Sequence, residues 1–114
     1  MGSRIIKIAK ERKMGVLCMK ALIERKWESS SERYASKFPK SWCKPIDIED
    51  EAFGIAAMKY AYSLGVDTLL PPGNFASFSF AVEHADECLR APLTAQECAL
   101  LEEKLQYVRG KEFF

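Results

Sequence analysis

Apolar residues recur with a helical period in the middle of the chain, between residues 53 and 64. They fall at positions i, i+3, i+4, i+7, i+8 and i+11, which places them on one stripe of a helix with 3.6 residues per turn. Asp47 is the predicted N-cap, and Gly65 is the predicted end because glycine enters the left-handed conformation at little steric cost. The stripe that should face a core contains Phe53, Ala56, Ala57, Tyr60, Ala61 and Leu64.

Two runs of consecutive apolar residues, at 16–19 and 66–70, predict strands that are buried on both faces. Pro71 and Pro72 end the second run, because proline cannot donate a hydrogen bond to a neighbouring strand. A long crossover separates the runs, so the strands are parallel if they pair, and their carboxyl ends lie at one edge. Parallel α/β folds bind their ligands at that edge.

Caps and periodicity predict helices at both ends of the chain. The first begins at Ser3 and runs to about Lys13, with an apolar face opposite a basic one. Asn74 is the predicted N-cap of another helix, and Thr94 and Glu97 have the capping-box spacing that starts the last one. The apolar faces expected in these three helices are Ile5, Ile8 and Ala9; Phe78, Ala81, Val82, Ala85 and Leu89; and Cys98, Leu101, Leu105 and Val108.

Residues 23–45 are polar, aromatic and rich in proline, and they predict a long loop with a short helix from Ser30 or Ser31 to Lys37. Loops of this length are either functional binding segments or plain excursions of the chain, and both interpretations stand.

Bulk composition predicts one ordinary globular domain, with 114 residues, of which 48% are apolar and 29% charged. Seventeen basic and sixteen acidic residues give a formal charge of +1, so no overall field favours nucleic acid or an anionic membrane. The sequence has no apolar run of about 18 residues and no apolar signal-peptide core, so a cytoplasmic location is expected.

Residues with catalytic or metal-binding chemistry are few. The cysteines have no CxxC spacing and the chain has a single histidine, His84, so reduced thiols and no metal site are expected. Lys20 is the unusual residue, because it is a cation that ends an apolar strand. It either extends its ammonium group to water or pairs with an anionic ligand or a carboxylate.

Five sequence blocks, by their order and spacing, resemble the C-terminal third of bacterial aldo/keto reductases. The resemblance covers about residues 3 to 107. It implies an α/β fold in which residues 1–114 form a single segment of a (β/α)8 TIM barrel, with two parallel strands and four to five helices. The blocks are GVLCMKAL at 15–22, FPKSW at 38–42, the helix at 51–64, VDTLLPPG at 66–73 and APLTAQE at 91–97.

The same resemblance implies which residues contact a nicotinamide cofactor, NADP or NAD, in the intact enzyme. Met19 matches a tyrosine that stacks on the nicotinamide ring in many members, and Lys20 follows it where serine is frequent. Pro72 and Gly73 replace the Lys-Ser pair that holds the adenosine phosphate. Gly73 and Asn74 retain backbone N–H groups at a helix N-terminus that can bind a phosphate.

The family's catalytic Asp, Tyr, Lys and His belong to the first half of the barrel and have no counterpart in this sequence. The resemblance therefore implies the C-terminal cofactor-side segment of a carbonyl reductase, without activity by itself. The alternative is a small α/β interaction module without enzymatic activity, which forms a homo-oligomer through its exposed strand edges. A third interpretation is a module that binds a nucleotide through the strand-end loops alone.

Overall fold

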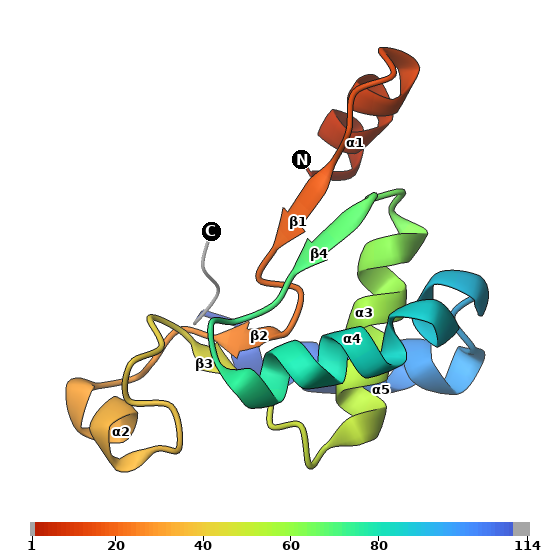
Figure 1. The fold of residues 1–114 in the computed structure, drawn as a ribbon. Coiled ribbons are helices and arrows are strands. Elements are labelled where there is room, and N and C mark those ends of the chain that lie inside the picture. The colour runs from red at the N-terminus through yellow and green to blue at the C-terminus, as the bar shows by residue number, and fades with distance from the viewer. Residues whose placement is uncertain (1, 111–114) are drawn as a thin grey trace.

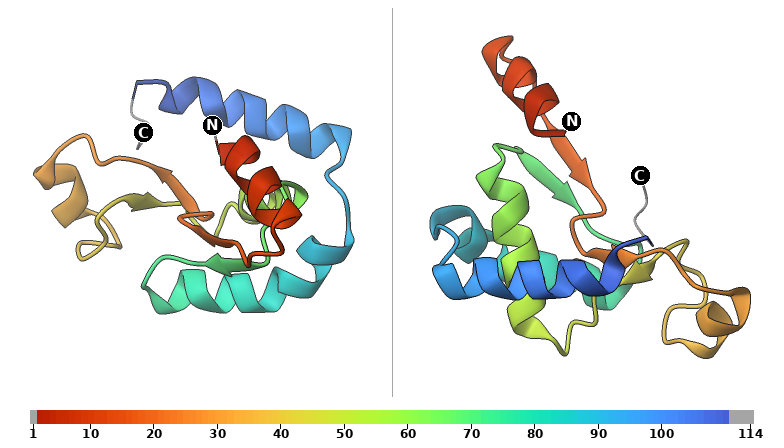
Figure 2. Two further views of the ribbon diagram at one scale, coloured as in Figure 1. Left: turned by 90° about the horizontal axis from the view of Figure 1, so that it is seen from above. Right: turned by 180° about the vertical axis from the view of Figure 1, so that it is seen from behind.

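The computed structural model describes residues 2–110, which form a mixed α/β fold with five helices and four short strands (Figure 1). Helix α3 lies between α4 and α5 and forms the centre of the packed body (Figure 2). In chain order the elements are α1 (Gly2–Glu11), β1 (Leu17–Met19), β2 (Ile23–Arg25), α2 (Ser30–Ala35), β3 (Lys44–Pro45), α3 (Glu51–Ser63), β4 (Thr68–Leu70), α4 (Phe75–Arg90) and α5 (Ala95–Val108).

Strands β1 and β4 pair in parallel, as predicted, with Leu17 opposite Thr68 and Met19 opposite Leu70. Burial on both faces, however, is wrong: Leu17 is 66% exposed and Met19 is 65% exposed. Successive side chains point to opposite faces of a strand, and only one face of this sheet packs on the core, where Leu69 lies. Among the described residues the sheet has two strands and no barrel closes, so its second face stays bare.

The segment 23–45 contains regular structure, so its prediction as one long loop is corrected. Strands β2 and β3 pair antiparallel. The short helix α2 starts at Ser30, as predicted, with Ser29 as its N-cap, and it ends at Ala35, two residues before the predicted Lys37. The Trp27 indole N–H donates to the Ser41 carbonyl over 2.9 Å and ties the two sides of the excursion together.

The N-cap of α3 is Asp50 and not the predicted Asp47, because Asp47 is used in a turn that precedes the helix. The Asp50 N–H donates to the Asp47 carbonyl, and the Asp50 side chain accepts from the Phe53 N–H. The helix ends at Gly65 as predicted, with φ +93°. Its burial extends beyond the predicted stripe to Met58, because two helices flank it.

Helix α4 has the predicted N-cap, Asn74, and buries only part of the predicted face: Ala81 is buried, whereas Phe78, Val82 and Leu89 are exposed. Phe78 is 56% exposed and Val82 is 63% exposed. The side chains that pack toward α3 are Ser77, Phe80, Ala81 and Cys88. The reason is the close approach at Gly54, where the Phe80 ring occupies the space that a Cβ would fill.

The two terminal helices bury less than predicted. Helix α5 has its capping box, but none of its residues is buried, so the predicted buried stripe is wrong. It is joined to α3 through Lys59 and Glu97, whose Nζ and Oε1 atoms are 3.0 Å apart. Helix α1 projects from the body beyond the N-terminal end of β1, and Ser3 lies within it and does not cap it (Figure 1). No helix in residues 2–110 is long and apolar enough to cross a membrane.

Candidate functional site

A groove of about 780 Å³ lies at the carboxyl ends of β1 and β4. Three segments line it: the end of β1 with the turn that follows, residues 37–43, and residues 70–74. All five residues that the sequence assigned to a cofactor site are among its lining residues. They are Met19, Lys20, Pro72, Gly73 and Asn74.

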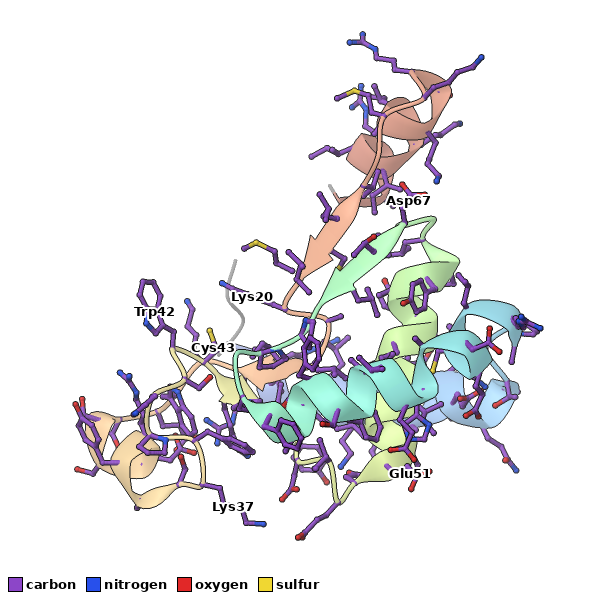
Figure 3. The ribbon with its side chains drawn as sticks, viewed as in Figure 1. Lys20, Lys37, Trp42, Cys43, Glu51 and Asp67 are labelled. Carbon is purple, nitrogen blue, oxygen red and sulfur yellow. The ribbon has the colours of Figure 1, made fainter. Side chains whose placement is uncertain are left out.

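Lys20 lies just outside β1 and turns the chain away from the sheet. It has φ +68°, and its carbonyl accepts a hydrogen bond from the Ile23 N–H over 3.1 Å. From this turn Lys20 extends toward the segment that carries Trp42 and Cys43 (Figure 3). Burial raises the pKa of the Cys43 thiol, and the charge of Lys20 opposes this effect. Cys43 is therefore a neutral, buried thiol and not a nucleophile.

The second wall consists of residues 37–43, which sequence reasoning did not assign to the site. It carries two lysines, Lys37 and Lys40, together with the indole of Trp42, which is 87% exposed. Backbone carbonyls of this wall accept hydrogen bonds from side chains nearby, as Pro39 does from Arg33 Nε over 2.7 Å. The FPKSW block at residues 38–42 was the sequence feature that could have pointed to this wall. Its position in the sequence, however, did not indicate that it lies opposite the strand ends.

The third wall is the turn from Pro71 to Asn74, which leads into α4. The Asn74 side chain is used in capping: its Oδ1 accepts from the Ser77 N–H over 2.8 Å, and its Nδ2 donates to Ser77 Oγ. A Cβ at Gly73 would meet no described atom within 4 Å, so this glycine leaves open space at the groove. The backbone of Asn74 is also engaged, because its N–H donates to the Pro72 carbonyl over 2.8 Å and its carbonyl accepts from the Phe78 N–H over 3.0 Å.

The groove combines positive charge with apolar walls. Lys20, Lys37 and Lys40 line it, and no carboxylate is among its lining residues within the described chain. Lys37 forms ion pairs with two carboxylates: its Nζ lies 3.4 Å from Glu49 Oε1 and 3.9 Å from Asp47 Oδ2. Such a site suits an anion that also carries a flat apolar group.

Within residues 2–110, the ionisable side chains of the groove are three lysines and one cysteine. No tyrosine, histidine, aspartate or glutamate lines it among the residues that the structure describes, and these residues hold no cluster of three or more metal-binding side chains. His84 belongs to the α3–α4 interface, where its ring centroid lies 4.4 Å from that of Phe80. The arrangement can bind and orient an anionic ligand.

Comparisons of the chain with protein-family models, with curated proteins and with solved structures find no match. The likeness to aldo/keto reductases therefore rests on the sequence blocks, and the site rests on its own geometry.

Proposed function

We propose that the groove binds a nicotinamide nucleotide, and that the chain is the C-terminal, cofactor-side segment of an enzyme that reduces carbonyl compounds. The observation that carries this proposal is the convergence of two distant segments. The resemblance implied cofactor contacts at Met19 and Lys20, after one strand, and at residues 72–74, after another. These two sets of residues line a single groove. A two-stranded piece of a barrel would have this arrangement.

The groove matches such a ligand in size, shape and charge. Its volume of about 780 Å³ falls in the usual range of ligand pockets. The Met19 thioether and the Trp42 indole offer apolar surfaces on which a flat ring can pack. Lys20 and Lys40 supply cations for the phosphates, and the N-terminus of α4 adds backbone N–H groups.

The bare sheet face also supports a role as part of a larger barrel. Leu17, Met19 and Leu70 all lie on exposed positions of β1 and β4. In a closed barrel the other strands would cover such positions with side chains. A chain that leaves them open has the shape expected of a segment.

The test is a titration of the chain, with both tryptophans kept, with NADPH and NADH, followed by energy transfer from tryptophan to the bound dihydronicotinamide. We expect saturable binding that Lys20→Glu and Lys40→Glu each weaken about tenfold, which corresponds to about 1.4 kcal/mol. Lys7→Glu, on α1, is the matched control and should change the affinity less than twofold. Absence of saturation, or an equal effect of the control, would overturn the proposal.

Reductase activity is not expected from the chain alone. Reduction of a ketone needs a proton donor beside the carbonyl carbon that accepts the hydride, and the described groove lacks the tyrosine, with its lysine and histidine neighbours, that serves this role in the resembling family. Ketone-dependent oxidation of NADPH by the purified chain, above the rate without protein, would contradict this expectation.

A second candidate function is that of a self-associating α/β interaction module. The observation that favours it is the unpaired outer edge of both β1 and β4 in a sheet of two strands. Exposed edges of this kind pair with other chains. Light scattering that shows a strict monomer of 12.9 kDa at high concentration would exclude this candidate and leave the nucleotide proposal unaffected.

A further inference from the structure

Helix α1 has an apolar face that packs on little of its own chain. No residue of the helix is buried. Ile6 and Ala9 are half-buried, whereas Ile5 is 60% exposed and Ile8 is 41% exposed on the neighbouring part of the same face. A helix of ten residues is marginal in water unless an apolar face packs against something. This face therefore lacks a partner.

An apolar groove of matching character lies elsewhere on the molecule. It has a volume of about 610 Å³ and runs between β1, α3 and α5. Its lining is mainly apolar, and the charged side chains among its described lining residues are two glutamates, Glu24 and Glu102, and two lysines, Lys20 and Lys104. Among the lining side chains are Cys18, Ala57, Leu64, Cys98, Leu101 and Leu105.

The charges of helices α1 and α5 are complementary. Helix α1 has three cations, Arg4, Lys7 and Lys10, against the single carboxylate Glu11, which gives a net charge of +2. Helix α5, which forms one side of the groove, has three carboxylates against one lysine, which gives a net charge of −2. The opposition of charge between the basic helix α1 and the acidic helix α5 therefore favours their contact, whereas the charged residues that line the groove itself balance.

The chain also exposes more surface than a compact monomer of its size. A folded monomer of 12.9 kDa exposes about 6,300 Å². This chain exposes 7973 Å². The surplus of about 1,700 Å² is roughly twice the 800 Å² that each partner buries in a standard protein–protein interface. The surface needed for a stable dimer is therefore present.

We infer that two copies of the chain associate by exchanging α1, so that the helix of each copy lies in the β1–α3–α5 groove of the other. Ile5 and Ile8 point into the groove, and Arg4, beside Ile8 on the helix surface, faces α5 of the other copy. The contact is reciprocal, as a twofold dimer requires. This inference does not depend on nucleotide binding.

The groove is occupied by α1 of a second copy, and not by the chain's own α1, because contacts with the loop before β4 hold α1 in place. Lys10 Nζ lies 2.7 Å from Asp67 Oδ1, and Asp67 Oδ2 accepts from the Val16 N–H over 2.8 Å. Only residues 12–15 separate the helix from that anchored point. Folding the helix back onto its own groove would break these contacts, whereas a second copy can receive it with the contacts intact.

Disulfide trapping tests the geometry directly, because Cys98 lines the groove. In a Cys18→Ser background, Ile8→Cys should form a disulfide-linked dimer on mild oxidation, seen as a band near twice 12.9 kDa on a non-reducing gel. Lys7→Cys, on the opposite face of α1, is the matched control and should give at least tenfold less dimer. Adding Cys98→Ser to Ile8→Cys should abolish the band.

Three outcomes would overturn the inference. One is a cross-link within a single chain, which would mean that α1 folds onto its own groove. Another is a dimer that persists with Cys98→Ser, because it would join two α1 helices directly. The third is an equal yield from Lys7→Cys, which would indicate random collision.

Light scattering gives an independent measurement. The unmodified chain should have a mass near twice 12.9 kDa, and the double variant Ile5→Glu, Ile8→Glu should return to 12.9 kDa. Because these side chains are not buried within their own chain, the circular dichroism of the body should be unchanged. A dimer that survives both substitutions would refute helix exchange and point to the strand edges. Retained NADPH binding by the double variant keeps this result separate from the proposed cofactor role.

Discussion

Replacing Gly54 by alanine tests how closely α3 and α4 pack. A Cβ built at Gly54 would lie 2.7 Å from both Cε1 and Cζ of Phe80, closer than two carbon atoms can approach. The Phe80 ring has little freedom to retreat, because it is almost fully buried and packs against His84. The substitution therefore forces two helices apart or moves a buried ring.

Two effects of opposite sign determine the size of the change. Alanine in a helix interior is favoured over glycine by about 1 kcal/mol. Overpacking of a close contact costs about 1–3 kcal/mol. The free energy of unfolding should consequently fall by about 0–2 kcal/mol in Gly54→Ala. Replacing a helical glycine that has open space around it by alanine would instead raise the free energy of unfolding.

A double-mutant cycle with Phe80→Leu separates the two effects. Leucine removes the ring tip, so in that background Gly54→Ala should stabilise the protein by up to about 1 kcal/mol. The coupling free energy between Gly54 and Phe80 should then be about 1–3 kcal/mol. Urea unfolding followed by circular dichroism at 222 nm measures all four variants. An equal gain in both backgrounds would refute the close packing of α3 on α4.

Three further predictions concern single contacts. Glu97→Ala should lower the free energy of unfolding, measured by urea unfolding, by about 2–3 kcal/mol. The substitution leaves the buried Lys59 unpaired and removes half of the capping box of α5. The control Glu102→Ala should change the free energy of unfolding by less than about 0.5 kcal/mol. Hydrogen bonds from Arg25 and from the Glu28 N–H lower the pKa of Glu32 from 4.5 to about 2. The contribution of Glu32 to folding stability is therefore complete above about pH 4.5 and is lost as the pH falls toward 2. Acid titration followed by tryptophan fluorescence should show this transition in the unmodified chain and not in Glu32→Gln. Gly65→Ala should cost about 1–2 kcal/mol in thermal or urea unfolding because φ is +93°, and Gly73→Ala, in open space, should be nearly neutral.

The residues that line the groove at the strand ends were predictable from sequence on only two of its three walls. Met19 and Lys20 follow a strand-like run, and residues 71–74 follow another, so the rule for parallel strands brings them to one edge. The wall with Lys37 and Trp42 was not predictable in this way. Its position depends on β2 pairing with β3 and on the Trp27 to Ser41 hydrogen bond, both of which join residues distant in sequence.

The sequence by itself determined the helix caps and the residues at which helices end. Asn74 caps α4, Thr94 and Glu97 form the capping box of α5, and Gly65 ends the segment that begins with α3. Each of these depends on a few neighbouring residues, because a cap satisfies backbone groups within one turn and a left-handed residue needs only its own freedom.

The tertiary structure alone decided which apolar faces are buried. Periodicity predicted a buried stripe on α4 that includes Phe78, Ala81 and Val82. The structure buries Ala81 together with Phe80, and it leaves Phe78 and Val82 exposed. Phe80 is buried because Gly54 leaves room for its ring on α3. Burial depends on the shape of the opposing surface, which hydrophobic periodicity along one segment does not contain.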